Sequence, residues 1–390
     1  MKKSYNILYL SMSVLLMLMI GAVYTFSVFR PHIQHIYSLS TLESGYPYMM
    51  SLFFYAFSMM VTGRILKPKN TFVILMTGTL MIGLGWILSG LSQSFIGFLL
   101  SYGVLIGIGV GMVYGIPIRG IQDIYPAKKG FFMGIILLGF GLSTLVVAPL
   151  STYLIETVGI KSTFYIYGIA FLVMAIPFSW ILKYRKIDTH QVSTETQIVS
   201  PLSITGKQIY LYFVIATTIG LMMIGLSYYI GVEVYEFDPW RVALSMSFFA
   251  FMNGISRPLF GLLMDRKGFY YSVKLSFMLM MIGAIISMLN RGTHLALFMI
   301  SYSIFWFNLG AWLAIIPATV RIKYGSENYS KVYGYIFTGY GIGAILGTLL
   351  SGFIMDFFGD TFYIYLIIMI MIGSLFMYVL KTSKIKTIIS

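Results

Sequence analysis

The chain has 390 residues, of which 58% are hydrophobic and 10% are charged, and its formal net charge is +14. Soluble domains carry about 25% charged residues, so this composition excludes an ordinary water-soluble globular protein and makes lipid the solvent for most of the surface. The sequence has no cysteine, which excludes disulfides and cysteine-ligated metal sites.

Apolar segments long enough to cross a membrane follow one another along the chain. A spanning helix needs about 20 mostly apolar residues, and its backbone satisfies its own hydrogen bonds in lipid. The unbroken apolar run at 363–380 lacks the alternation that is typical of barrel strands. Twelve helical spans are therefore predicted, at residues 7–29, 45–66, 71–92, 95–118, 130–153, 163–183, 208–231, 241–264, 272–290, 294–318, 332–354 and 361–381.

Basic residues are distributed unevenly between the two ends of these spans. Of the 26 lysines and arginines, 21 fall on the side of the two termini, 4 fall on the other side and Arg257 falls within a span. Because basic loops stay in the cytoplasm, this pattern places both termini there and predicts a multi-pass protein of the bacterial cytoplasmic (inner) membrane. No basic face is concentrated in one domain, so nucleic-acid binding is not expected.

The second half of the chain repeats features of the first half at an offset of about 200 residues. Two six-helix halves, 1–183 and 208–390, are therefore expected, joined by a polar cytoplasmic linker at 184–207. Such halves are typical of a secondary transporter that binds its substrate between them, whereas a duplication kept for packing alone is the alternative. The matches are Gly134, Gly139, Gly141 and Gly159 with Gly334, Gly339, Gly341 and Gly359, Pro117 with Pro317, and the TFYIY motifs at 163–167 and 361–365.

Several motifs are similar to those of a known superfamily. The loop from Gly261 through Asp265 and Arg266 to Gly268 resembles the loop signature of major facilitators, although its counterpart at 63–69 lacks the acid. The segments at 21–29, 102–114, 139–141, 257–261 and 333–341 resemble more specifically the oxalate/formate antiporter family, with the monocarboxylate porters as near relatives.

This resemblance implies an all-α membrane protein with the major facilitator fold, in which twelve transmembrane helices form two pseudo-symmetric six-helix halves. It also implies a gating role for Gly261, Asp265 and Arg266, whose charges would bridge cytoplasmic helix ends. A merely solvated loop is the alternative for these three residues.

Arg257 lies deep within the eighth predicted span. It precedes Asp265 by eight residues, which places it about 12 Å inside the membrane. An arginine there is expected to face a cavity or a partner, and no acid lies at a comparable depth in any predicted span. Its planar fork is therefore predicted to bind a substrate carboxylate, a contact that the resemblance also implies, while pairing with backbone carbonyls or with Asp265 is the structural alternative.

The neighbours of Arg257 in the predicted site depart from both related families. The resemblance implies a second cation on helix 11 of oxalate porters, where this chain has Tyr340, and an aspartate four residues before the arginine of monocarboxylate porters, where it has Asn253. The helix 1 lysine of the latter is also missing near Val28. One cation suits a monocarboxylate, or a larger anion held partly by aromatics, better than a dicarboxylate. Because the proton-coupling groups of the monocarboxylate porters are missing, exchange or facilitated movement of a small organic anion is predicted, with proton symport left open.

Aromatic and amide side chains are expected to complete the site. Hydroxyl and indole groups donate to a carboxylate while the rings exclude water, although packing or a membrane-interface belt is the alternative for each aromatic residue and an interhelical hydrogen bond is the alternative for Asn308. The histidines show no metal-ligand spacing, so no metal or other cofactor is expected. Besides Arg257, the predicted substrate-binding residues are Tyr24, Tyr114, Asn253, Trp306, Asn308, Trp312 and Tyr340.

Other functional classes are weighed against this prediction. An efflux pump for a drug or for an anionic or zwitterionic metabolite is the main alternative, although a cation exporter usually needs an acid in the membrane. An enzyme or sensor is not expected, because no nucleophile motif, phosphate loop or buried acid/base pair is present in the sequence. The expected partners are a small organic anion and membrane lipid, and the protein is expected to be monomeric.

Overall fold

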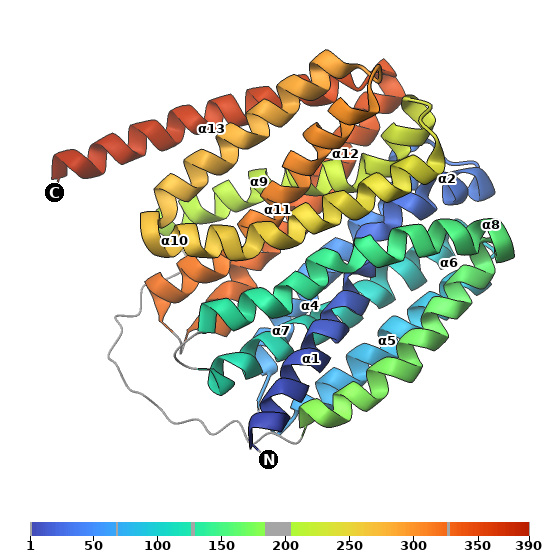
Figure 1. The fold of residues 1–390 in the computed structure, drawn as a ribbon, viewed down its shortest axis with the longest axis horizontal. Helices are drawn as coiled ribbons and strands as arrows, with labels where there is room; N and C mark the ends of the chain where they lie inside the picture. Colours follow the sequence, from blue (N-terminus) through green and yellow to red (C-terminus); the bar gives the residue numbers. More distant parts are fainter. Residues whose placement is uncertain (1, 68, 126–128, 184–203, 326–327, 390) are drawn as a thin grey trace.

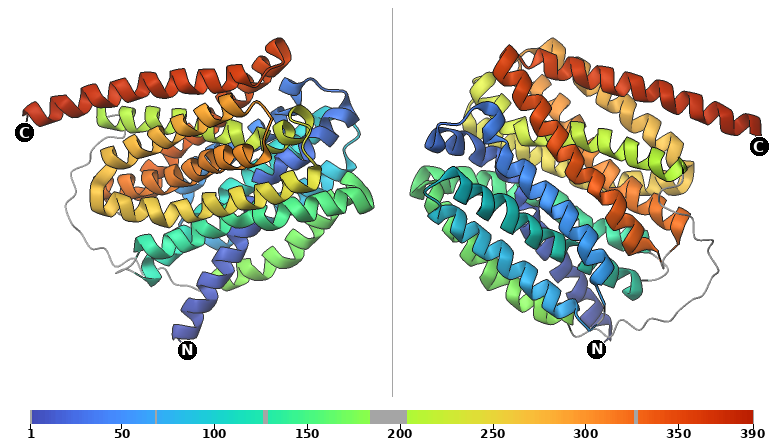
Figure 2. Two further views of the ribbon diagram at one scale, coloured as in Figure 1. Left: turned by 45° about the horizontal axis from the view of Figure 1, so that its top comes forward. Right: turned by 180° about the vertical axis from the view of Figure 1, so that it is seen from behind.

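The computed structural model describes residues 2–67, 69–125, 129–183, 204–325 and 328–389. These residues are almost entirely helical and include no strand. The helices run side by side in two groups, one coloured blue to green and the other yellow to red (Figure 1). Both views in Figure 2 keep the two groups on opposite sides of the molecule, as two helical halves packed against each other.

The helices follow the predicted spans in chain order, and some spans consist of more than one element. In order, the elements are α1 (Lys2–Ile20), the 3-10 turn η1 (Gly21–Thr25), α2 (Phe26–Tyr37), α3 (Thr41–Ser44), α4 (Tyr46–Ile65), α5 (Thr71–Leu91), α6 (Phe95–Phe98), the π-helix η2 (Leu99–Ile106), α7 (Gly107–Ile124), α8 (Lys129–Lys183), α9 (Ile204–Tyr229), the π-helix η4 (Ile230–Val234), α10 (Pro239–Asn290), α11 (Leu295–Tyr324), α12 (Tyr329–Phe358) and α13 (Phe362–Ile389).

Two of these helices are too long to be single spans. Eight segments of the described chain are long and apolar enough to cross a membrane, and two of them, Phe132–Phe178 and Pro239–Asn290, have 47 and 52 residues. A straight 47-residue helix would be about 70 Å long, against a hydrocarbon thickness of about 30 Å. Each therefore contains two spans, and together with α4 and α13 the described chain contains the twelve predicted spans.

A glycine reverses the chain within each of these two long helices. Gly159 in α8 has φ 80° and Gly268 in α10 has φ 76°. Side chains strain a backbone of this hand, and glycine adopts it freely. The helices run up to these glycines, so the loops predicted at 154–162 and 265–271 are shorter in the structure than in the sequence analysis.

The first span is longer than predicted. It was expected to end at residue 29, but α1, η1 and α2 continue it to Tyr37. Arg30, which was assigned to a loop, lies inside α2 with only 3% of its surface exposed. The prediction was wrong because a hydropathy criterion ends a span at the first charge, whereas this guanidinium has hydrogen-bond partners within the protein.

The boundary between the halves consists of long helix pairs. The segment of α8 before Gly159 packs against the segment of α10 before Gly268, and α4 packs along α12. A Cβ atom on Gly141 of α8 would lie 2.9 Å from the Cα atom of Gly254 of α10, so these two backbones approach as closely as small residues allow. The halves are thus in direct contact where the predicted site lies.

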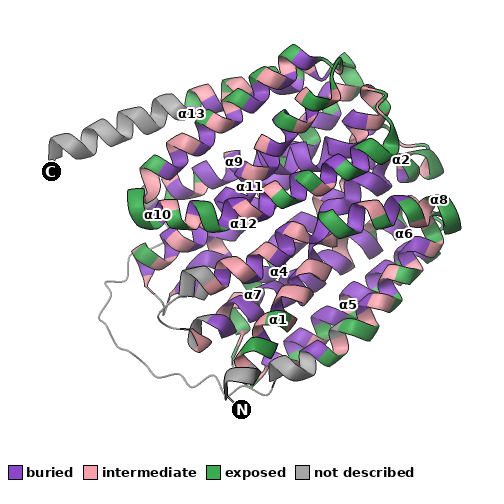
Figure 3. Cartoon of the chain, in the orientation of Figure 1, coloured by how far each residue is buried: buried purple, intermediate pink, exposed green. Residues whose placement is uncertain are grey.

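Burial follows the pattern expected of a protein in lipid. The centre of the bundle is buried, whereas outward faces of the helices are exposed (Figure 3). Large apolar side chains lie on those faces, including Ile96, Leu289 and Phe357, with exposed fractions of 70%, 77% and 74%. An apolar exterior of this extent suits contact with acyl chains. Below, the membrane side that carries the termini is called the terminal side, and the opposite side is called the far side.

Candidate substrate site between the two halves

A hydrogen bond between two tyrosines joins the halves at the centre of the bundle. Tyr24 lies in η1, where the helix of the first span tightens into a 3-10 turn, and Tyr340 lies in the middle of α12. Their hydroxyl oxygens are 2.5 Å apart, and both side chains are fully buried. Short 3-10 segments within a helix often mark functional hinges. Two predicted site residues from opposite halves therefore meet here.

Arg257 lies in the first segment of α10, with 1% of its surface exposed. One Nη atom donates to the carbonyl oxygen of Leu137 in α8, and the other donates to Oδ1 of Asn253 at 3.1 Å. Its guanidinium carbon lies 5.8 Å from the ring centre of Phe140, and its Nε–H has no hydrogen-bond partner. Among the described residues, all hydrogen-bond partners of this cation are therefore neutral.

Asn253 holds Arg257 in place through a chain of hydrogen bonds. Its Oδ1 accepts from the guanidinium, while its Nδ2 donates to the carbonyl oxygen of Trp306 in α11 at 2.7 Å. The indole Nε1 of Trp306 donates in turn to Oγ of Ser227 in α9 at 2.9 Å. The amide of Asn253 is therefore placed to position Arg257, while the ring of Trp306 lies 6.4 Å from that of Tyr24.

Aromatic rings enclose the two tyrosines and the arginine. The ring of Tyr24 lies 5.1 Å from that of Phe140, which in turn lies 5.4 Å from the ring of Tyr114. Tyr55 of α4 lies 5.2 Å from Tyr114 and 5.7 Å from Tyr340. These contacts place Tyr114, a predicted site residue, in the same buried cluster as Tyr24 and Tyr340.

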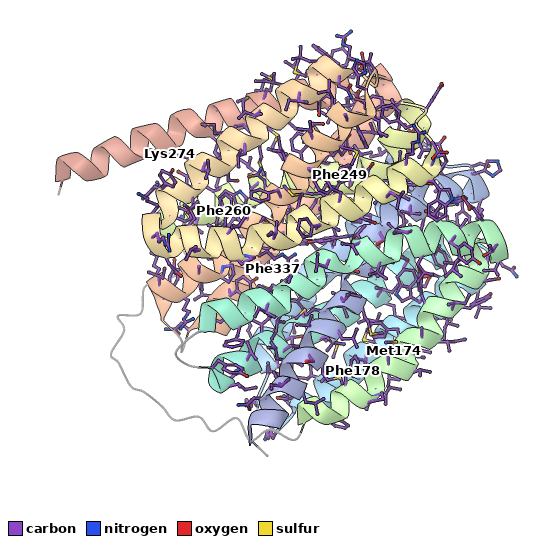
Figure 4. All side chains as sticks on the ribbon, in the orientation of Figure 1. Met174, Phe178, Phe249, Phe260, Lys274 and Phe337 are labelled. Carbon is purple, nitrogen blue, oxygen red and sulfur yellow. The ribbon has the colours of Figure 1, made fainter. Side chains whose placement is uncertain are left out.

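The sequence analysis missed three rings of this cluster, those of Tyr55, Phe140 and Phe337. Phe140 stands between the repeated glycines at 139 and 141, and this position was the available signal for it. Phe337, labelled in Figure 4, lies three residues before Tyr340 and stacks on its ring at 4.9 Å. It also touches Tyr55 across the boundary between the halves, with ring centres 5.2 Å apart.

Trp312 and Asn308 lie at the contact between α11 and the second segment of α10. The indole Nε1 of Trp312 donates to Oγ of Ser276 at 2.8 Å, and that hydroxyl donates to Oδ1 of Asn308 at 2.8 Å. Ser276 belongs to the second segment of α10, so this chain ties α11 to that segment. The structure does not bring either residue to Arg257, and for Asn308 it shows the interhelical hydrogen bond that was the structural alternative.

The predicted gating residues lie on the terminal side. Asp265 and Arg266 are exposed near the end of the first segment of α10, just before the turn at Gly268, and Gly261 is half-buried one turn earlier. Their arrangement is that of a helix end at the membrane surface. The bridging role is a prediction that depends on the other conformations of the protein.

A network on the far side joins the halves, and the sequence analysis missed it. The carboxylate of Asp356 in α12 accepts the backbone N–H groups of Thr41 and Leu42 in α3, both at 2.9 Å. Arg30 donates to the carbonyl oxygen of Thr41 at 2.7 Å and to that of Gly225 in α9 at 3.2 Å. We call Arg30, Thr41, Leu42, Gly225 and Asp356 the far-side clasp, since three of these four hydrogen bonds run from the first half to the second and the fourth joins Arg30 to Thr41 within the first half.

A cavity of about 790 Å³ opens beside this clasp, between α2, α8 and α9. Its lining includes two carboxylates, Glu156 and Glu233, and the side chain of His32. In the part of the chain that the structure describes, no three histidine, aspartate or glutamate side chains come together as a metal site would require. We call this cavity the far-side vestibule. Its two carboxylates lie on the far side, whereas the cation Arg257 is buried at the boundary between the halves.

Twelve spanning helices in two halves, with a buried polar cluster at their boundary, define the class of membrane transporters that work by alternating access. The sequence profile of the Major Facilitator Superfamily matches residues 12–323. The chain belongs to this superfamily and is a multi-pass membrane transporter.

The chain is similar to several known proteins over most of its length. It is 24% identical to the MFS-type transporter YhjX of Escherichia coli (strain K12) over 84% of this chain and 82% of that one. It is 23% identical to the oxalate:formate antiporter of Oxalobacter formigenes, over 90% and 85% of the two chains. These similarities confirm the resemblance predicted from the motifs.

The fold also matches a solved structure. A bacterial homolog of the human lysosomal transporter Spinster, in an inward-facing and occupied conformation, superposes with a TM-score of 0.65. The sequences are 18% identical, and the match covers 91% of this chain and 82% of that one. The predicted fold class is thereby confirmed, while this level of identity shows the fold alone.

Proposed function

We propose that this transporter carries a small organic anion, a monocarboxylate, across the bacterial cytoplasmic membrane by alternating access. The observation that carries the proposal is Arg257, a buried cation with neutral partners and one unused N–H donor. A charge in the interior of a membrane protein needs a counter-charge or water. A carboxylate between the halves supplies that counter-charge and accepts charge-assisted hydrogen bonds.

The hydroxyl groups of Tyr24 and Tyr340 add donors on the other side of the same cluster. They satisfy each other at 2.5 Å, and turning one of them toward a bound anion requires only a rotation about the C–O bond. One cation with two neutral hydroxyls matches the single charge of a monocarboxylate. The oxalate:formate antiporter among the relatives supports the carboxylate class, and Tyr340 in place of the second cation implied by that resemblance favours the singly charged member.

The orientation and organisation of the chain are part of the proposal. The 21 basic residues on the terminal side favour cytoplasmic termini. The halves are proposed as 1–183 and 208–390 with a linker at 184–207, of which 184–203 lie outside the described residues, while 204–207 already belong to α9. We further propose that the protein acts as a monomer, that Asp265, Arg266 and Gly261 take part in closure of the cytoplasmic side, and that no cofactor takes part.

A thermal-shift screen tests the substrate class. Purified protein is heated with formate, acetate, lactate or oxalate, and with acetamide as an uncharged control. A monocarboxylate at ten times its Kd stabilises the folded state by about 1.4 kcal/mol. We expect this shift for the wild type and its loss in Arg257→Gln, while acetamide shifts neither. Equal stabilisation of both proteins by a carboxylate would remove Arg257 from the site.

Proteoliposomes separate exchange from proton symport. Vesicles loaded with the carboxylate found in the screen are compared with empty vesicles, with and without an inward pH gradient. We expect uptake only into loaded vesicles, because none of the partners of Arg257 among the described residues is a carboxylate that could carry a proton. Uptake into empty vesicles driven by the pH gradient contradicts exchange and favours symport.

A second candidate is an exporter of a zwitterionic metabolite. The observation that favours it is the far-side vestibule, where Glu156 and Glu233 would attract an ammonium group while Arg257 binds a carboxylate. The screen therefore includes glycine and alanine. Stabilisation by these amino acids but not by acetate or lactate decides for the zwitterion.

A further inference from the structure

A second cavity lies between the halves, toward the terminal side. Its volume is about 40 Å³, and it is bordered by α4 and α7 of the first half and by α12 of the second. A cavity needs roughly 10–15 Å³ to hold one water, so this one has room for two or three waters or for a carboxylate group. Its lining residues include Thr62, Gly115, Arg119, Tyr329 and Tyr333, and we call it the terminal-side cavity.

Among the residues that the structure describes, two donors at this cavity have hydrogen-bonding capacity that no protein acceptor uses. Arg119 of α7 is half-buried, and its Nη1 donates to the carbonyl oxygen of Leu66 at 3.3 Å. That carbonyl is neutral and occupies one of five N–H donors of the guanidinium. Tyr329 is 7% exposed, and its hydroxyl is buried without a hydrogen-bond partner. This hydroxyl can therefore donate to an anion in the cavity without giving up a bond to another described residue.

A continuous row of buried aromatic rings links this cavity to the central site. Tyr329, Tyr333, Phe337 and Tyr340 follow one face of α12 at spacings of four, four and three residues. Their successive ring centres are 5.4, 5.5 and 4.9 Å apart, and Tyr340 reaches Tyr24 (Figure 4 labels Phe337). Eleven residues of helix separate the two ends of the row by about 16 Å.

We infer that Arg119, Tyr329 and Tyr333 form a second carboxylate site, which holds the transported anion between the central site and the cytoplasm. The inference rests on the proposed function for the identity of the anion and for the side on which it leaves. Each site offers one arginine and tyrosine hydroxyls, so a monocarboxylate exchanges one set of partners for an equivalent set. The row of aromatic rings lies along the path between them.

The absence of native cysteine allows a test that needs no knowledge of the substrate. Thr62 lines the cavity, and Thr62→Cys provides a thiol beside Arg119. Its reaction rates with a sulfonate-bearing and a trimethylammonium-bearing methanethiosulfonate are compared in inside-out vesicles. We expect the thiol to react faster with the anionic reagent. The ratio of the anionic to the cationic reaction rate is expected to fall about tenfold in Arg119→Gln and to be retained in Arg119→Lys.

In Arg119→Gln the glutamine keeps a donor for the carbonyl oxygen of Leu66. This variant therefore removes the charge of Arg119 rather than its hydrogen bond to Leu66. The matched control is Tyr271→Cys, which is 51% exposed on the terminal side but does not line the cavity. Its reagent preference is expected to be unaffected by Arg119→Gln. No reaction at Thr62→Cys, or an equal change at both cysteines, overturns the inference.

A second measurement separates the new site from the central one. Formate, acetate and lactate at matched ionic strength are tested for protection of the Thr62→Cys thiol. We expect protection to persist in Arg257→Gln and to disappear in Arg119→Gln. Loss of protection in Arg257→Gln alone overturns the inference. If none of the three anions protects any variant while Arg119 still sets the reagent preference, the proposed substrate class fails and the second carboxylate site fails with it, leaving only a positive potential.

Discussion

The far-side clasp offers a direct way to shift the balance between the two faces of the transporter. Asp356 of the second half accepts two backbone N–H groups from α3 of the first half. The substitution Asp356→Asn keeps the size of the side chain, removes its charge and leaves one oxygen to accept a bond. The clasp is expected to weaken, so that the form open on the far side becomes more populated.

The size of the effect follows from the two contacts. A hydrogen bond to a charged group contributes about 1.5–3 kcal/mol. In Asp356→Asn one bond is lost and the other loses its charge, but the contact with Leu42 faces solvent and is weakened there. A net loss of about 2 kcal/mol is therefore expected, and because 1.36 kcal/mol corresponds to a factor of ten, the ratio of open to closed forms rises about 30-fold.

Spin labels on paired cysteines measure this ratio. Leu91→Cys in α5 and Leu289→Cys in α10 place labels near the far side of opposite halves, on side chains that are 58% and 77% exposed. Pulsed dipolar spectroscopy is expected to show a longer distance gaining weight in Asp356→Asn.

The matched control is Asp360→Asn. The Asp360 carboxylate accepts the N–H of Phe362 within its own half at 2.8 Å, and its bond does not connect the halves. No change in distances is expected for this variant. An unchanged distribution in Asp356→Asn, or the same lengthening in Asp360→Asn, refutes the clasp.

Three further predictions concern the central site. Tyr24→Phe and Tyr340→Phe each remove one of the two hydroxyl donors, so each is expected to raise the KM of exchange about fivefold and the double variant to raise it further; an unchanged KM in all three variants contradicts a role of these hydroxyls in binding. Asn253→Asp places a carboxylate against Arg257, and thermal shift is expected to show at least a tenfold loss of anion affinity at neutral pH; unchanged affinity contradicts the anion site. Trp312→Phe is expected to lower the Tm through its lost hydrogen bond while leaving anion affinity intact, and altered affinity would return it to the site.

The membrane spans, and the position of Arg257 inside one of them, could be predicted because both depend on local amino-acid composition. A run of about 20 apolar residues determines a span whatever packs against it. A charge in the middle of such a run is conspicuous in the sequence alone. Arg30 was misplaced because its partners, the carbonyl oxygens of Thr41 and Gly225, come from other elements, and Gly225 lies 195 positions away in the other half.

The two tryptophans of α11 show what spacing could have added. Six residues separate Trp306 from Trp312, and at about 100° per residue their side chains point in directions about 120° apart around the helix. They cannot both face one central site, and in the structure Trp306 reaches toward α9 while Trp312 reaches toward α10. Helical spacing alone could therefore have separated them, whereas the choice of the inward residue required the tertiary structure.

The neutral surroundings of Arg257 have an electrical consequence. Since the partners of Arg257 among the described residues are neutral, the charge of Arg257 is uncompensated by them without substrate, whereas a bound monocarboxylate cancels it. A unit charge that crosses the whole membrane field changes in energy by about 2.3 kcal/mol per 100 mV. An inside-negative membrane potential thus shifts the equilibrium of the substrate-free protein toward its inward-facing form. It has no such effect on the protein with a bound monocarboxylate. Under the proposed function, the membrane potential acts on the transition between the outward-facing and inward-facing forms when no anion is bound. An electrical current during transport therefore reports how often the protein makes this transition without substrate.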